Sequence, residues 1–161
     1  MNPLNALISN YALVCTGAAW LTAQIGKMFT GIFKLREFSI TAMLFGTGGM
    51  PSSHSAAVCA LATACALRYG LDSGYFAIAF LLCIIVMRDA TGVRRETGKQ
   101  AKVLNRILSD LFSSTDRDEI NENLKELVGH TPLQVFVGAT LGVAMPFLVA
   151  LIPYYSEYLP L

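Results

Sequence analysis

Long apolar runs separated by short polar segments dominate the pattern along this chain. Four runs, at residues 4–26, 53–69, 73–91 and 131–152, have about the 20 residues that a helix needs to cross a hydrocarbon core of about 30 Å. The pattern therefore predicts four transmembrane helices. Because no Lys or Arg precedes the first run, we expect it to be retained rather than removed as a signal peptide.

Two further segments show helical patterning. Residues 38–46 are apolar but too few to span a membrane, which predicts a short re-entrant or interfacial helix. In the polar segment 97–127, apolar residues recur at helical spacing from Leu104 to Leu111, which predicts an amphipathic helix lying across the cytoplasmic face. Together these elements predict an all-α fold, an integral membrane helical bundle formed by a single domain over residues 1–161.

Composition supports a membrane protein, and the distribution of charge predicts its orientation in the membrane. The chain of 161 residues is 54% hydrophobic and 14% charged, whereas soluble domains are about 25% charged. Of its twelve Lys and Arg residues, only Arg68 lies in the connection 68–74, and the others fall at or between helix ends on the opposite side. The positive-inside rule makes that side cytoplasmic, so we expect a cell-membrane protein with both termini outside.

The cysteines carry no motif. All lie inside apolar runs without a C-x-x-C pair, so we interpret them as packing residues and infer neither a disulfide nor a metal site. The chain also lacks an H-x-x-E-H motif, a Cys/His cluster and a paired-carboxylate arrangement, and we expect no cofactor. The cysteines are Cys15, Cys59, Cys65 and Cys83.

Four polar motifs stand at predicted helix ends on the cytoplasmic side, and they include both histidines of the chain. Lys27 follows the first apolar run, and "GGMPSSHS" (48–55) opens the second. "RDATGVRRETGKQ" (88–100) closes the third run, and "GHTPLQ" (129–134) opens the fourth. Because these ends share one side of the bundle, we expect their side chains to converge there.

The motif "GGMPSSHS" has the features of an anion site. Pro51 followed by Ser52 and Ser53 predicts a helix start with a serine cap, and a helix N-terminus attracts anions. His54, just inside the helix, would point its imidazole at the bound group. The structural alternative is that a serine only caps the helix while His54 rests in the headgroup layer.

A basic cluster favours the functional interpretation. Arg88, Arg94, Arg95 and Lys27 could surround one tetrahedral oxyanion, although topogenic charge is an alternative explanation for them. Arg88 directly follows "LLCIIVM", and ionisable groups at membrane depth are costly and usually functional. The neighbouring Asp89 either orients one of these arginines or pairs with Arg88.

The motif "GHTPLQ" combines a structural part with a chemical one. Thr131, Pro132 and Gln134 predict a capping box with proline at the first helical position, which leaves His130 unexplained. A neutral imidazole can attack phosphorus while a second histidine, His54, protonates the leaving oxygen. These groups are sufficient for phosphoryl transfer without a metal.

"MPSSHSA", "RDATGVRRETGKQAKVLN" and "GHTPLQVFVGATLGV" resemble the divergent branch of the type-2 phosphatidic acid phosphatase family, which is related to the vanadium-dependent haloperoxidases. The resemblance extends from about Ala18 to Leu148 and implies a compact helical bundle with its active site at the membrane-facing helix ends. It implies that Lys27 binds phosphate, that His54 is the general acid and that His130 is the nucleophile.

Three departures from the family pattern stand out. Leu124 occupies the place of a phosphate-binding arginine, so the resemblance requires Arg94 and Arg95 to substitute for it. Gln134 stands where an aspartate normally polarises the nucleophile, and an amide orients His130 without stabilising its positive charge. The chain also has four full spans where the family usually has six helices.

These observations lead to two hypotheses for function. The first is a metal-independent lipid-phosphate phosphohydrolase, which acts on a lipid phosphate monoester or pyrophosphate through a phosphohistidine. The alternative is a non-hydrolytic protein of the same fold that binds or transports anionic lipid. In either case the expected partners are the bilayer and a lipid phosphate rather than nucleic acid, with a homodimer as a further candidate.

Overall fold

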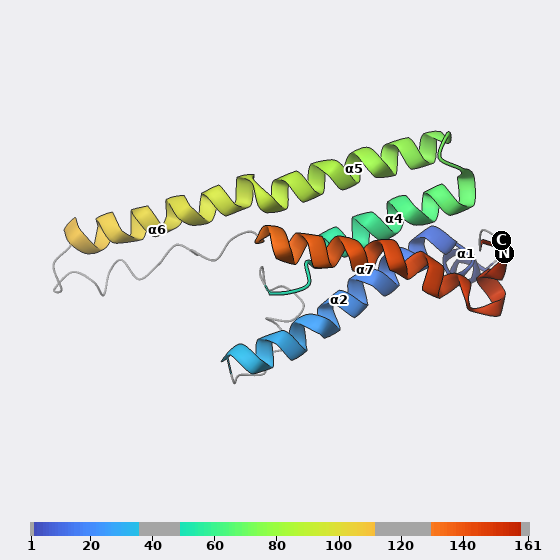
Figure 1. Ribbon diagram of the computed structural model, residues 1–161, viewed down its shortest axis with the longest axis horizontal. Coiled ribbons are helices and arrows are strands. Elements are labelled where there is room, and N and C mark those ends of the chain that lie inside the picture. Colours follow the sequence, from blue (N-terminus) through green and yellow to red (C-terminus); the bar gives the residue numbers. More distant parts are fainter. Residues whose placement is uncertain (1, 36–48, 112–129, 159–161) are drawn as a thin grey trace.

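The computed structural model describes residues 2–35, 49–111 and 130–158, and these residues form helices without any strand (Figure 1). The predicted helix at 38–46 and residues 112–127 of the predicted amphipathic segment, which include Leu124, lie outside the described residues. The elements are α1 (Pro3–Ile8), α2 (Tyr11–Leu35), α4 (Ser53–Tyr69), α5 (Gly74–Thr91), α6 (Val93–Leu111), α7 (Pro132–Ala150) and the 3-10 helix η1 (Pro153–Tyr158).

Local capping sets the start of three of these helices. Ser52 caps α4 and Ser73 caps α5, each through its side-chain oxygen. Thr131 and Gln134 form the predicted reciprocal capping box at the start of α7. Gly70 ends α4 with φ of 87°, a conformation that glycine adopts without steric cost, and this allows the sharp turn into α5. The boundaries predicted for these helices are therefore confirmed to within about two residues.

The first apolar run differs from its prediction. Instead of one helix over 4–26, α1 and α2 are separated at Ser9 and Asn10, because Asn10 Oδ1 accepts a hydrogen bond from Leu13 N (3.2 Å) and starts a new helix there. The second helix then continues to Leu35, since residues 27–35 contain no proline. Lys27 consequently lies within α2 rather than at its exit.

The amphipathic helix also differs from its prediction, in the direction in which it runs. It begins at Val93, where the hydrogen bonds from Gly92 N to Arg88 O (2.8 Å) and from Glu96 N to Gly92 O (3.0 Å) carry the helical pattern through the junction. As a result α6 runs on from α5 and extends beyond the bundle, rather than lying across the helix ends (Figure 1).

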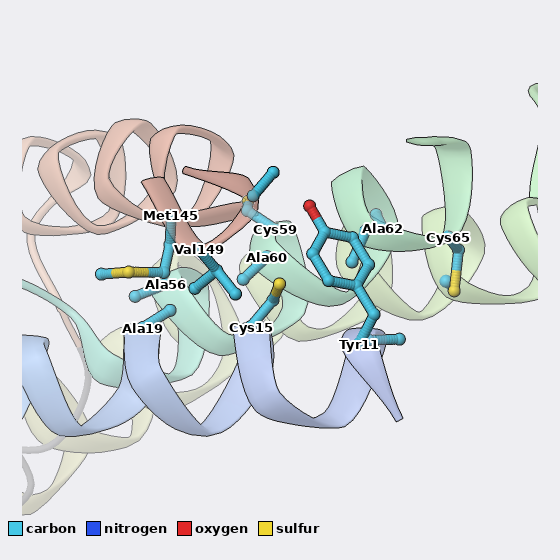
Figure 2. Packing of buried hydrophobic residues seen from close by; sticks show 14 of the residues in the cluster. Tyr11, Cys15, Ala19, Ala56, Cys59, Ala60, Ala62, Cys65, Met145 and Val149 are labelled. Atoms are coloured by element: carbon cyan, nitrogen blue, oxygen red, sulfur yellow. The ribbon is translucent and has the colours of Figure 1, made fainter. Parts of the chain in front are cut away.

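Helix α4 lies at the centre of the bundle and packs against α2, α5 and α7. Its contacts with α2 involve small side chains, such as Cys15 and Ala19 on α2 opposite Ala56 and Ala60 on α4 (Figure 2). Small residues let helix backbones approach closely, which is how helices associate in membranes, where the lipid is as apolar as a leucine side chain. The core is therefore packed through small side chains, as is typical of membrane proteins.

The large apolar side chains point mainly outward. On α5, for example, Ile78, Leu81 and Ile85 are all exposed, an arrangement that lipid tolerates and water does not. By length and composition, two helices in the described ranges could cross a membrane: the continuous helix from Gly74 to Leu108 and α7. The predicted number of four transmembrane helices is thus not confirmed, while the all-helical class is.

Candidate functional site

The N-termini of α4 and α7 lie side by side, and their backbones are in direct contact. Ser52 N donates a hydrogen bond to Gln134 O (3.0 Å). Gly138 packs against the Ser52 carbonyl and Gly142 against the Ala56 carbonyl, so closely that a Cβ on either glycine would collide with that oxygen. From the first contact to the second, the residue number rises by four on both helices, so α4 and α7 run parallel to each other. Their N-termini, the positive ends of the helix dipoles, therefore point to the same region.

Both histidines belong to these two helix starts. His54 is the second residue of α4 and is exposed, while His130 immediately precedes the cap of α7 and is 5% exposed. Their ring centroids are 6.3 Å apart with an interplanar angle of 53°. The backbone N–H of His130 donates to Ala90 O (3.0 Å), which attaches this residue to the end of α5. Residues far apart in the sequence thus face each other.

The side chain of Gln134 determines the orientation of His130. Its Oε1 accepts a hydrogen bond from Thr131 N (2.9 Å), which identifies this atom as the oxygen because a backbone N–H only donates. The same oxygen lies 3.3 Å from His130 Nδ1. An amide oxygen cannot donate, so Nδ1 is the donor in this contact, and in the neutral imidazole Nε2 then bears the lone pair.

Lys27 joins the site from α2. Its Nζ donates to Ser53 Oγ (2.9 Å), and its stem packs 3.6 Å from the position of a Cβ on Gly49, whose φ of 83° favours glycine. The side chain is half-buried just beyond the apolar run 4–26, and desolvation lowers the pKa of its ammonium group. The cation therefore has a neutral hydroxyl as its hydrogen-bonded partner.

The serines of α4 differ in what they do. Ser52 is fully buried, and its Oγ caps the helix by accepting from Ser55 N (3.3 Å) and also contacts Ser55 Oγ (3.0 Å). Ser53 is 2% exposed and is oriented toward Lys27 by the hydrogen bond above. Ser52 thus holds the helix end in place, whereas the hydroxyl of Ser53 belongs to the polar group around Lys27.

The predicted arginines cluster at the junction of α5 and α6. Arg88 and Arg95 have exposed side chains and Asp89 is half-buried, while the side chain of Arg94 lies outside the described part of the structure. The hydrogen bond from His130 N to Ala90 O brings this junction next to the histidine pair. The backbone of His130 thus connects the basic segment to the site.

Comparison with known proteins identifies the family of this chain. A family model described as the divergent PAP2 family matches residues 8–145. The chain belongs to the divergent PAP2 family. It is also 40% identical, over 153 residues, to the uncharacterised membrane protein YuiD of Bacillus subtilis (strain 168), a match that covers 89% of this chain and 96% of the relative. No solved structure matches the chain at a significant level.

Family membership confirms the resemblance seen in the three motifs. The similarity to YuiD supports the prediction that this chain is a membrane protein. Among the described residues of this divergent PAP2 protein, no group of three or more His, Cys, Asp and Glu side chains has the arrangement of a metal site. The chemistry available at the site is that of two imidazoles, a half-buried ammonium group and two helix N-termini, a combination suited to a tetrahedral anion.

Sequence reasoning missed the glycines that set the spacing of this site. Gly138 and Gly142 form a G-x-x-x-G pattern on α7, the spacing that lets two helices in a membrane make backbone contact. The glycine spacing is visible in the sequence, but the sequence does not show which helix the two glycines contact. In the structure they pack against Ser52 and Ala56 of the same chain. This contact holds the two histidine-bearing helix ends together.

Proposed function

We propose that this protein is a lipid-phosphate phosphohydrolase that uses His130 as nucleophile and His54 as general acid. The observation that carries the proposal is the histidine pair, whose rings face each other 6.3 Å apart at two adjacent helix N-termini. In-line transfer needs about 3 Å from the attacking nitrogen to phosphorus and a hydrogen bond of about 3 Å from the leaving oxygen to the acid. With the P–O bond between them, the two reacting nitrogens would be about 7–8 Å apart, which rings with centroids 6.3 Å apart can provide because their nitrogens lie at the ring edges.

The reaction would proceed in two balanced steps. In the first, the lone pair of His130 Nε2 forms a bond to phosphorus while the P–O bond to the lipid breaks, and His54 gives its proton to the departing oxygen. In the second, neutral His54 takes a proton from water, whose oxygen attacks phosphorus and breaks the N–P bond. Inorganic phosphate leaves and both histidines return to their initial states.

Positive charge around the pair supports phosphate binding. The N-termini of α4 and α7 contribute partial positive charges, and Lys27 adds a full charge next to Ser53. We propose that Arg88, Arg94 and Arg95, at the α5–α6 junction, complete the group that stabilises charge on the phosphoryl oxygens in the transition state. Asp89 would orient one of these arginines.

The surroundings of the site favour an amphiphilic substrate. Leu133 and Phe136 in the first turns of α7 are exposed, and so is Phe29 of α2, two residues after Lys27. Such side chains can lie against an acyl or prenyl tail while the phosphate occupies the polar end. Phosphatidic acid, phosphatidylglycerophosphate and a polyprenyl phosphate are the candidates. Both termini lie at the opposite end of the bundle (Figure 1), which supports a cytoplasmic site with termini outside.

A second function, binding or transport of anionic lipid without hydrolysis, has one specific observation in its favour. His130 contacts the neutral amide of Gln134, whereas a carboxylate would stabilise the imidazolium that forms during phosphoryl transfer. This alternative predicts phosphate binding with no turnover.

Phosphate release from a panel of lipid phosphates separates the two functions. The full chain, purified in detergent with EDTA present, is compared with His54→Ala and His130→Ala. We expect release by the unmodified protein and its loss in both variants. Release that persists in both variants would refute the two-histidine mechanism. Lipid binding without release from any substrate would favour the transport alternative.

A further inference from the structure

Three sulfur atoms from two helices meet inside the bundle, after His54 on α4 and before Ala90 on α5. Cys59 Sγ on α4 lies 3.4 Å from Cys83 Sγ and 3.9 Å from Met87 Sδ, both on α5. Cys83 and Met87 are four residues apart and therefore share one face of their helix. The two cysteines are buried and the methionine is half-buried. We call Cys59, Cys83 and Met87 the sulfur cluster.

The type of ligand selects the type of cation. Thiolates and thioethers are soft ligands that favour Cu(I), whereas structural zinc sites hold four ligands in a tetrahedron. The described helices bring three sulfurs together at this point. We propose that the sulfur cluster binds one monovalent soft cation, Cu(I) or its analogue Ag(I), between α4 and α5. This inference is independent of the proposed phosphatase activity.

The distances are close to those that such a site needs. Thiolate sulfur lies about 2.3 Å from a bound metal ion, so three sulfurs arranged in a plane around one ion are about 4 Å apart. The contact between Cys59 and Met87 already has this separation, at 3.9 Å. The contact between Cys59 and Cys83 would open by about half an ångström, which small side-chain rotations can provide.

Charge balance explains why the cation would be monovalent. On binding, one thiol loses its proton to water and forms a thiolate–cation bond, while the other thiol and the thioether coordinate as neutral ligands. The occupied cluster is then neutral overall, and this avoids the cost of an uncompensated charge among apolar side chains. A divalent cation would need a second thiolate to reach the same balance.

The third helix closes the cluster on one side. A Cβ on Gly142 of α7 would come within 2.7 Å of Cys59 Cβ, so Cys59 has little freedom to move away from α5. A bound cation would join α4 to α5 through direct bonds. Because it would bind the folded protein and not the separated helices, it should raise the thermal stability of the bundle.

Copper retention tests the proposal directly. The full chain in detergent, reduced with a phosphine and kept anaerobic, is incubated with Cu(I) supplied as a chelator complex and then separated by gel filtration. We expect about one copper per chain, with a rise in melting temperature. We expect loss of retained copper in Cys59→Ser, Cys83→Ser and Met87→Leu, the last of which conserves volume and should leave the fold intact.

Cys65→Ser is the matched control, because Cys65 is also buried on α4 but lies outside the sulfur cluster. This variant should retain copper like the unmodified protein. The proposal is overturned if the unmodified chain retains no copper, or if Cys59→Ser or Met87→Leu retains as much as the unmodified chain does. It is also overturned if mass spectrometry finds that copper only oxidises Cys59 and Cys83 to a disulfide.

Discussion

The two ends of the helical bundle place polar groups in different environments. At the end that holds both chain termini, the buried hydroxyl of Tyr11 donates to Pro146 O (2.7 Å) and that of Tyr155 donates to Ile8 O. The Tyr11 and Tyr158 rings stack with centroids 4.4 Å apart, and the Arg68 guanidinium lies 5.4 Å from the Tyr158 ring. Polar donors and aromatic faces at this end bind other parts of the same chain.

At the opposite end, Lys27 and His130 contact neutral side chains. Lys27 is hydrogen-bonded to the hydroxyl of Ser53, and His130 contacts the amide of Gln134. Two helix N-termini add further positive potential. The comparison indicates that the terminal end contributes mainly stability, because its interactions are complete within the protein. At the histidine end, Lys27 and the two helix N-termini contribute positive potential, which is the basis of the proposed phosphate site. Substitutions at the two ends should therefore affect different properties.

The largest effect should come from His130→Asn. We expect the rate of phosphate release to fall by about 10³-fold or more, because the variant lacks the nucleophilic nitrogen. The melting temperature should change little, since the hydrogen bond to Ala90 O uses the backbone N–H of residue 130. Phosphate release and thermal unfolding are measured on the same preparation. A variant that keeps most of its activity would remove His130 from the mechanism.

Lys27→Met should weaken substrate binding. The change removes the charge and keeps an unbranched stem over Gly49, so we expect KM to rise by about 10- to 100-fold, from the loss of a hydrogen bond to a charged group. Lys99→Met is the control, because Lys99 is exposed and paired with Glu96, an ion pair of small energetic value. Equal KM values for the two variants would contradict a role for Lys27 in phosphate binding.

Gly138→Ala should affect both stability and activity. The added methyl group would collide with the Ser52 carbonyl and push α4 away from α7, so we expect a loss of about 1–3 kcal/mol in stability and a lower rate as the histidines separate. Gly17→Ala is the matched control, because nothing lies within 4 Å of its Cβ position and alanine favours helix. Thermal unfolding of both variants checks the difference, and equal stabilities would show that the close contact is not required.

Gln134→Glu should change the pH dependence of the reaction. A carboxylate in this position would stabilise the imidazolium form of His130, whereas the nucleophile must be neutral. The acidic limb of the profile of kcat/KM against pH should therefore move to higher pH, and the fold should be retained because glutamate also forms a capping box. An unchanged profile would show that the contact between residues 130 and 134 has no influence on catalysis.

The smallest effect should come from Tyr11→Phe, at the terminal end. The variant leaves the Pro146 carbonyl without its buried donor, and we expect a loss of about 1 kcal/mol in stability with unchanged phosphate release. Tyr154→Phe, whose ring is exposed, should have no effect on either property. Loss of activity in Tyr11→Phe at normal stability would contradict the division of roles between the two ends.

The sequence predicted the elements best where local signals were strong. The serine cap predicted after Pro51 and the Thr131–Gln134 capping box mark helix starts within a few residues, and the structure confirms them. The break at Ser9 and Asn10 was missed, because a cap inside an apolar run does not change its average hydropathy. The direction of α6 was also missed, since the amphipathic pattern indicates which faces are apolar but not how the helix leaves its neighbour.

The sequence by itself determined that this chain is helical and apolar, where most of its helices begin and to which family it belongs, because caps and hydropathy act over a few residues. Only the tertiary structure decided which side chains meet. The separation of His54 and His130 depends on how closely α4 approaches α7, and the absence of a side chain at Gly138 opposite the Ser52 carbonyl permits that approach. The meeting of Cys59 with Met87 likewise depends on helix packing, which no local spacing reveals.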